Sequence, residues 1–423
     1  MTGPEIPLSE DSAVMEVIEA AVSKLAEQLQ EARAESDRLF GILKPEALYQ
    51  RPIAERHRVI FYIGHLDSFD AIRICREALG MNSPDAELDQ LFLAGIDPDS
   101  AHLPTDSPTD WPSLDQVKAY VKRCRRRVDD ALDHVSEEMV CMAIEHRQMH
   151  LETLAYMFHN FDYELKAPKA DERTANRHQA FPTEEWCEIP AGEAVLGKAR
   201  DGSFGWDNEY ERLRVSVPAF AVQRYSVTNG KYLEFVNQGA KLPNFWRRHG
   251  GSIYLRGMFE EFLLPFDWPV YVTQQEAHAY AAWRGKELLT EAQFHRAAYG
   301  TALGTTRTYP WGDSEPRDIL GNFDLKRWNP EPVNATPQGD SAFGVSQLVG
   351  NGWEWTRTPF GPFPGFHPHK AYPGYSANFF DDQHYVMKGA SSRTAARLLR
   401  PSFRNWFRQD YPYMYATFRC VDN

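Results

Sequence analysis

The sequence predicts an α-helical bundle followed by an irregular α+β domain. The 423-residue length exceeds the roughly 250–300 residues at which single hydrophobic cores stop growing. Apolar residues follow helical spacing in the first part of the chain, whereas Trp111 is the one tryptophan of 11 before residue 181. The intervening segment 166–180 has no large aliphatic or aromatic residue and is predicted to be a linker. The predicted domains therefore span residues 1–165 and 181–423.

Four helices are predicted in the first domain, which makes a four-helix bundle the expected architecture. The third helix has its own start signal, because Gln116 follows Ser113 by three residues in a capping-box pattern. Two further helices are expected at about residues 57–79 and 138–161. The first and third are marked by apolar residues at 3.6-residue spacing: Val14, Ile18, Val22, Leu25 and Leu29, then Val117, Val121, Cys124, Val128, Leu132 and Val135.

The second domain is rich in Gly, Pro and aromatic residues and is predicted to contain short strands and long loops. Arg214–Val217 is one expected strand. Helices are expected at Thr228–Asn237 and Gln274–Arg284. This pattern does not fit a regular array of alternating strands and helices.

Charge and composition exclude several classes of protein. The 46 Lys and Arg against 59 Asp and Glu give a net charge of −13, which argues against sequence-independent nucleic-acid binding. The basic run Lys122–Arg127 is instead predicted to be a solvated helix face. No segment approaches the roughly 20 apolar residues of a membrane span, and the N-terminus lacks the features of a secretory signal. Five widely spaced cysteines without a CxxC pair fit a reducing compartment, so a cytoplasmic protein is expected.

The most informative pattern is a set of histidines on predicted helices. His146 and His150 lie four residues apart, about 40° around a helix, so their imidazoles can share one metal ion. Glu152 lies about 160° further around and should point away from the pair. His65, in an apolar segment beside Gly64, is the best third ligand. Spacing alone leaves two interpretations open, a metal site or a buried, hydrogen-bonded histidine pair.

The rest of the sequence gives no further indication of a catalytic site. The sequence contains no glycine-rich phosphate loop and no nucleophile elbow. Other histidines in polar or basic settings, His159 and His295 among them, are predicted to be solvated. Imidazole ligands suit iron, zinc and copper alike, so the residues by themselves do not select the metal.

Both parts of the chain resemble known families. His65 with His146 and His150 resembles the DinB-type four-helix bundle with its three-histidine metal site. The second part resembles the formylglycine-generating-enzyme fold, which is C-type-lectin-like, over nearly its full length. The order of the two domains is similar to the EgtB-type sulfoxide synthases of ergothioneine biosynthesis and the related OvoA-type enzymes. The resemblance of the second part rests on Ser226–Asn229, Pro269-Val270, Ala281–Ala292, Tyr309–Gly312, Gly350–Thr356 and Phe418–Cys420.

The resemblance implies a non-heme iron(II) enzyme that uses O2 to join a thiol sulfur to the imidazole of hercynine or histidine, giving a sulfoxide. It implies that Met149, Arg404, Asn405 and Trp406 bind the substrate, with Trp406 facing the trimethylammonium group. Tyr375 is the expected catalytic acid. A structural calcium ion in the second domain is a further expectation. The implied partners are therefore small molecules, a histidine betaine and a thiol or selenol donor, with no nucleic acid or membrane.

Departures from the family pattern leave the sulfur donor open. Met149 stands where many relatives have Gln, and Phe407 follows Trp406 where many have Asp. The segment Glu77–Val117 has no Lys or Arg, whereas relatives that use γ-glutamylcysteine have a basic residue there. The alternatives are C–Se bond formation with a selenosugar, a zinc-dependent DinB-type thiol transferase, and a non-catalytic binding module. The chain is not expected to oxidise a sulfatase cysteine as formylglycine-generating enzymes do, because Met387–Tyr415 lacks the cysteine pair that this reaction requires.

Overall fold

A computed structural model describes residues 10–93, 103–167 and 182–423. The chain divides into two compact units, one containing residues through Leu154 together with Asn160–Ala167, the other containing Ala155–His159 and the chain after Ala167. The predicted order, a helical bundle followed by an irregular α+β domain, is confirmed. Most of the predicted linker lies outside the described residues. Within the described ranges, no helix combines the length and the apolarity needed to cross a lipid bilayer.

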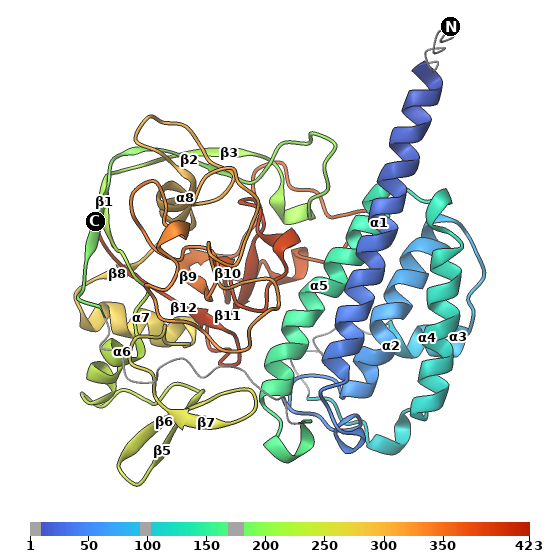
Figure 1. Cartoon of the computed structure of the whole chain (residues 1–423), viewed down its shortest axis with the longest axis horizontal. Helices are drawn as coiled ribbons and strands as arrows, with labels where there is room; N and C mark the ends of the chain where they lie inside the picture. Colours follow the sequence, from blue (N-terminus) through green and yellow to red (C-terminus); the bar gives the residue numbers. More distant parts are fainter. Residues whose placement is uncertain (1–9, 94–102, 168–181) are drawn as a thin grey trace, which may run out of the picture. The chain divides into compact units, whose positions relative to one another are not determined.

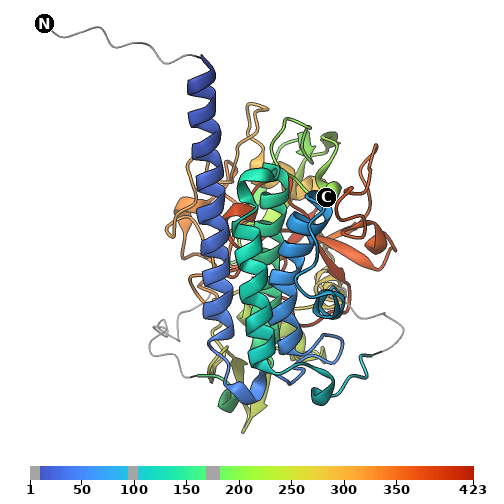
Figure 2. The same cartoon turned by 90° about the vertical axis from the view of Figure 1, so that its right-hand side faces the viewer.

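Among the described residues, four long helices make up most of the first unit, and their axes are roughly parallel in Figures 1 and 2. They are α1 (Glu10–Phe40), α2 (Val59–Asp70), α4 (Leu114–Asp129) and α5 (Glu137–His159), and a π-helical segment, Ala71–Ala78, continues α2. A fifth, short helix that the sequence pattern did not predict is α3 (Ala86–Phe92). The side chains of residues 10–22 are not described.

The start of α4 follows the predicted capping box. Ser113 Oγ accepts from the Gln116 N–H at 3.4 Å, and Gln116 Oε1 accepts from the Ser113 N–H at 2.9 Å. These bonds satisfy two backbone groups that a helix end leaves without partners. The helix ends at Asp129, before the predicted Val135, because the chain turns there into a short 3-10 helix.

The basic run on α4 is paired with acidic groups of its own unit. Arg125 Nε lies 3.0 Å from Asp67 Oδ1, and its terminal nitrogens lie 2.7 and 2.8 Å from the Asp37 carboxylate. Arg123 lies 3.1 Å from Asp85. Lys122 and Arg126 are exposed, as predicted. Arg123 and Arg125, which make these contacts, are half-buried.

In its described residues, the second unit contains four small sheets and, besides the last residues of α5, three α-helices. The strand orders are β1-β4-β13-β8, β11-β10-β9-β12, β2-β3 and β5-β6-β7. Their bounds are β1 Trp186–Ile189, β2 Gly192–Leu196, β3 Leu213–Val217, β4 Phe220–Gln223, β5 Trp246–His249, β6 Ser252–Arg256, β7 Glu261–Leu263, β8 Glu287–Leu288, β9 Gly352–Pro359, β10 His384–Ala390, β11 Asn405–Arg408, β12 Ala416–Thr417 and β13 Cys420–Asp422. The helices are α6 (Asn229–Val236), α7 (Gln274–Trp283) and α8 (Glu291–Tyr299). The predicted strand and both predicted helices of this domain are present as β3, α6 and α7.

The prediction that His159 and His295 are solvated is wrong, since both are buried. His295 lies on α8, whose described residues are almost all buried, and its Nδ1 lies 2.8 Å from the Val195 carbonyl oxygen. Burial lowers the pKa of the His295 imidazole well below its usual value. The polar neighbours in its sequence are themselves buried and bonded, which the pattern alone did not reveal.

Candidate metal centre

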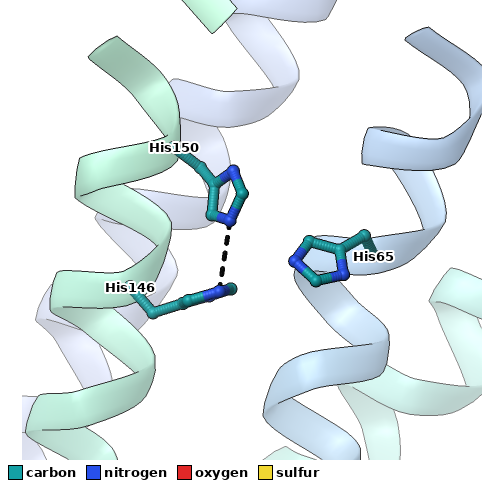
Figure 3. Close-up of side chains that lie close together, drawn as sticks. All are labelled: His65, His146 and His150. Atoms are coloured by element: carbon teal, nitrogen blue, oxygen red, sulfur yellow. Dashed lines mark hydrogen bonds between the residues drawn. The ribbon is translucent and has the colours of Figure 1, made fainter. Parts of the chain in front are cut away.

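The three predicted histidines converge in the first unit. His65 comes from the middle of α2, and His146 and His150 come from successive turns of α5 (Figure 3). Each offers one ring nitrogen, and these three atoms all lie within 4.8 Å of one another. The side chains are only 5, 2 and 1% exposed, respectively. The structure thus brings together the pair that helical spacing predicted and the third histidine that its apolar segment predicted.

A hydrogen bond fixes the tautomer of His65. Its Nδ1 lies 2.7 Å from the Phe92 carbonyl oxygen, so Nδ1 carries the proton and donates it. Nε2 is then the lone-pair atom, and it is buried without a hydrogen-bond partner among the described residues. In Figure 3 the His65 ring projects from α2 toward the pair on α5. A buried polar atom left unsatisfied costs roughly 1–3 kcal/mol, and a metal ion bound to Nε2 would remove that cost.

The spacing of the α5 pair suits a shared metal. His146 Nε2 and His150 Nε2 lie 3.2 Å apart, a hydrogen bond between the two rings in Figure 3, so this distance also fits the alternative of a hydrogen-bonded pair. Two nitrogens at about 2.1 Å from one ion, subtending about 90–110°, are about 3.0–3.4 Å apart. The pair therefore already has the separation of two ligands on one ion, and His65 approaches from the facing helix.

All three imidazoles are electrically neutral at neutral pH. Burial lowers the pKa of His65 to about 4, despite the hydrogen bond to Phe92, which opposes the shift. Burial, followed by the neighbouring histidines, lowers the pKa values of His146 and His150 well below their usual value. Only a neutral imidazole can offer a lone pair to a metal, so the environment holds the ligands in the binding form.

Carboxylates stay outside the centre. Glu152 is buried but is not part of the converging group, in agreement with the predicted direction of its side chain. In the parts of the chain that the structure describes, no other set of three His, Cys, Asp or Glu side chains converges in this way. The calcium ion expected in the second domain stays a prediction, since calcium also binds backbone carbonyl and amide oxygens.

A buried ion cluster that sequence analysis missed joins the two helices that carry the three histidines. Arg147, the residue after His146, donates from one terminal nitrogen to Asp67 Oδ1 at 2.8 Å and to Asp70 Oδ2 at 2.7 Å. Its other terminal nitrogen donates to Ser36 Oγ of α1 at 3.1 Å. All four side chains are buried. The sequence did contain a pattern that could have indicated this cluster. Asp67 follows His65 by two residues and Arg147 follows His146 by one, so the two side chains can pair when the histidines converge.

The predicted substrate residues lie in both units. Met149, half-buried, precedes His150 on α5. Asn405 and Trp406 begin β11 and pair with Met387 and Val386 of β10. Asn405 Oδ1 accepts from the Trp406 N–H at 2.9 Å. The substrate contacts assigned to these residues stay predictions.

An aromatic cluster surrounds the Trp406 ring within the second unit. Phe360 is stacked on it, with ring centroids 4.2 Å apart and planes at 5°. Tyr375, the predicted acid, makes an edge contact at 5.4 Å and is itself stacked on Trp206 at 4.0 Å. The structure thus brings Tyr375 and Trp406 together. It adds Phe360 and Phe379, the latter at 5.7 Å, as neighbours of Trp406, and Trp206 as a neighbour of Tyr375.

The Arg404 guanidinium is bonded within the protein. It lies 2.9 and 3.1 Å from the two Glu291 oxygens and 2.9 Å from the Gly361 carbonyl oxygen. It also lies over the Phe363 ring at 4.2 Å. These contacts anchor the residue that leads into β11. Its assignment as a substrate contact stays a prediction.

The segment before β11 is held by alternating contacts. Arg400 and Ser402 bind the buried Glu209 carboxylate, and Ser402 Oγ lies 2.6 Å from it. Lys388 donates to the carbonyl oxygens of Pro401, at 2.8 Å, and Phe403, at 2.5 Å. Burial lowers the pKa of Lys388 to about 8. These contacts hold both the side chains and the backbone carbonyls of the segment, so the backbone that leads into Asn405 and Trp406 is fixed in position.

Two family models cover nearly the whole chain. The DinB superfamily model matches residues 28–161, and the sulfatase-modifying factor enzyme 1-like domain matches residues 171–423. The hercynine oxygenase of Mycolicibacterium thermoresistibile is 32% identical over 94% of this chain and 94% of its own. The chain belongs to this EgtB-type family.

Other family members share parts of the chain. The hercynine oxygenase of Mycobacterium tuberculosis is 39% identical over 54% of this chain and 57% of its own. Ergothioneine biosynthesis protein 1 of Neurospora crassa is 27% identical over 90% of this chain and 55% of its own. The chain thus spans a little over half the length of these two relatives. The EgtB-type family combines both of the domain types that this structure contains.

Proposed function

We propose that this protein is an iron(II)- and O2-dependent sulfoxide synthase that joins a thiol sulfur to the imidazole of hercynine. The observation that carries the proposal is the group of three buried, neutral imidazoles with an orphaned Nε2 on His65. Support also comes from the relatives named hercynine oxygenase, one of which aligns with this chain along nearly its whole length.

The chain's own residues would bind the iron and hold its ligands in position. His65, His146 and His150 would hold the iron, which when bound offers open positions to both substrates and O2 and favours the thiolate form of the donor. The Phe92 carbonyl keeps the His65 proton on Nδ1, and Arg147 holds α2 against α5. Burial of the three rings keeps competing water and protons away from the ligand nitrogens.

Metal analysis of protein purified without oxygen tests the proposal. Iron close to one equivalent per chain is the expected result, with loss of O2-dependent turnover when a chelator removes it. Zinc in its place would favour a DinB-type thiol transferase. A chain that retains no metal would favour a binding module.

Replacement of Trp406 with Leu is expected to weaken hercynine binding about thirtyfold. We infer that the indole face not covered by Phe360 receives the trimethylammonium group, and a desolvated cation–π contact contributes roughly 2 kcal/mol. Plain histidine, whose amine is held by hydrogen bonds, should lose less. Calorimetry on the metal-loaded, oxygen-free protein measures both ligands.

The matched control is Trp283→Leu, the same substitution at a ring that is 42% exposed on α7. It should leave both affinities unchanged. Equal losses for hercynine and histidine in Trp406→Leu would contradict the cation–π role and indicate a packing defect.

The donor is expected to be smaller or less anionic than γ-glutamylcysteine. Glu77–Val117 has no cation of its own. Asp106 in this segment already pairs with Arg51 and Arg58, the latter at 2.8 Å, and also accepts from the Trp111 ring N–H at 2.8 Å. These arginines are therefore occupied and do not present a free site for a γ-glutamyl carboxylate. Steady-state kinetics with cysteine and with γ-glutamylcysteine decide the point, and a higher kcat/KM for the dipeptide would contradict it.

A further inference from the structure

The short helix α3 contacts the metal centre from outside the two helices that carry the ligands. Its last residue, Phe92, supplies the carbonyl oxygen that binds His65 Nδ1. We propose that α3 is a positioning element that sets the orientation of His65 and thereby the affinity of the centre for metal. Gly64 and Tyr120 are the positioning residues that hold it in place. The inference deepens the proposed metal centre and rests on it.

Gly64 is required by the position of the Phe92 ring. A Cβ atom at residue 64 would lie 2.4 Å from Phe92 Cζ and 2.5 Å from both Cε atoms, far inside contact distance. The ring is fully buried, and the Phe61, Trp111 and Tyr120 rings lie around it at centroid distances of 6.4, 6.4 and 5.6 Å. The group that approaches Gly64 most closely is therefore this ring.

The ring and the carbonyl of Phe92 are mechanically linked because they belong to one residue. Relief of a 2.4 Å contact to an ordinary carbon–carbon separation requires a shift of about 1 Å. Such a shift, transmitted to the backbone, would stretch the 2.7 Å bond from His65 Nδ1 beyond hydrogen-bond range. His65 would then lose the partner that fixes its tautomer and ring angle. Loss of such a partner to a metal ligand typically lowers metal affinity 10–100-fold.

Tyr120 of α4 holds the middle of α3. Its hydroxyl donates to Asp89 Oδ1 at 2.6 Å and lies 3.0 Å from Ser68 Oγ of α2. Asp89 stands one helical turn before Phe92, and both the Tyr120 and Asp89 side chains are buried. Asp85 caps the start of α3 by accepting from the Leu88 N–H at 3.3 Å. These bonds tie α3 to α2 and α4, so the Phe92 carbonyl is held at a defined place relative to His65.

The test is a Co²⁺ titration of the metal-free, full-length chain, followed by the visible absorption of bound Co²⁺. Gly64→Ala should bind Co²⁺ 10–100-fold more weakly and shift the absorption bands. Tyr120→Phe, which keeps the ring and removes only the hydroxyl, should weaken binding several-fold. Tyr49→Phe is the matched control, because its hydroxyl donates to the Pro112 carbonyl oxygen at 3.0 Å and not to a residue of α3. Its Co²⁺ affinity should be unchanged.

A compensating variant separates positioning from general stability. Phe92→Leu retains the backbone carbonyl and makes room, so Gly64→Ala with Phe92→Leu should recover most of the lost affinity. A double variant as weak as Gly64→Ala would overturn the proposal, as would wild-type affinity and absorption in Gly64→Ala. If Gly64→Ala does not fold by circular dichroism, Tyr120→Phe decides, and unchanged Co²⁺ binding there overturns the proposal. A wild-type chain that binds no Co²⁺ would instead remove the proposed centre itself.

Discussion

His146→Ala is expected to abolish metal retention and O2-dependent turnover while the helical bundle stays folded. The substitution removes one of three nitrogens that lie within 4.8 Å of one another. Loss of a group that is hydrogen-bonded to a metal ligand already lowers metal affinity about 10–100-fold. Loss of a ligand itself should therefore lower metal affinity more than about 100-fold. Metal content after gel filtration and circular dichroism of the same sample measure the two effects separately.

Two controls keep this result interpretable. His134→Ala removes an exposed histidine of the same unit and should retain the metal. Glu152→Gln should also retain it, since that side chain is outside the converging group. Full metal and activity in His146→Ala, or in the equivalent variants of His65 and His150, would contradict the centre as described.

Arg147→Met is expected to lower the free energy of unfolding by about 3–5 kcal/mol. The substitution removes the cation that the buried Asp67 and Asp70 share at 2.8 and 2.7 Å. Asp67 keeps Arg125 at 3.0 Å, whereas Asp70 has no other ion pair among the described residues. Burial, with the neighbouring Asp67 charge, raises the pKa of Asp70 even though Arg147 opposes the shift, so an uncompensated charge there is costly. Urea unfolding of the metal-free chain, followed by circular dichroism, measures the change without the contribution of bound metal.

Arg126→Met is the matched control, because Arg126 is exposed on α4. Its free energy of unfolding should change by no more than about 0.5 kcal/mol. A loss below about 1 kcal/mol in Arg147→Met would show that the cluster does not stabilise the contact between α2 and α5.

The local features of this fold were predictable from the sequence. The capping box at Ser113 and Gln116 depends on residues three apart, and the His146–His150 pair depends on residues four apart. Both patterns are fixed by helix geometry and need no knowledge of the rest of the chain. His65 was a weaker inference, which depended on the apolar segment around it and on the resemblance to a known bundle.

The rest depends on contacts between residues distant in sequence. The acceptor for His65 is a backbone carbonyl 27 residues away, at the end of a seven-residue helix in a segment without helical periodicity. Phe360 covers Trp406 although 46 positions separate them in the sequence. Polar neighbours suggested a solvated His295, whereas tertiary packing buries nearly all of α8. Such features follow from packing, which a single sequence does not encode in any short pattern.

The most direct test of the proposed function is product analysis after reaction with ¹⁸O2. The full-length chain, loaded with Fe²⁺ under anaerobic conditions, is mixed with hercynine and cysteine, and separately with γ-glutamylcysteine, before labelled oxygen is added. Mass spectrometry should then find an adduct of hercynine and the thiol that carries one ¹⁸O atom as a sulfoxide. The adduct should be absent without iron and absent in His146→Ala. An iron-loaded wild-type chain that forms no such adduct with either thiol, or an adduct that forms equally without iron, would contradict the proposal.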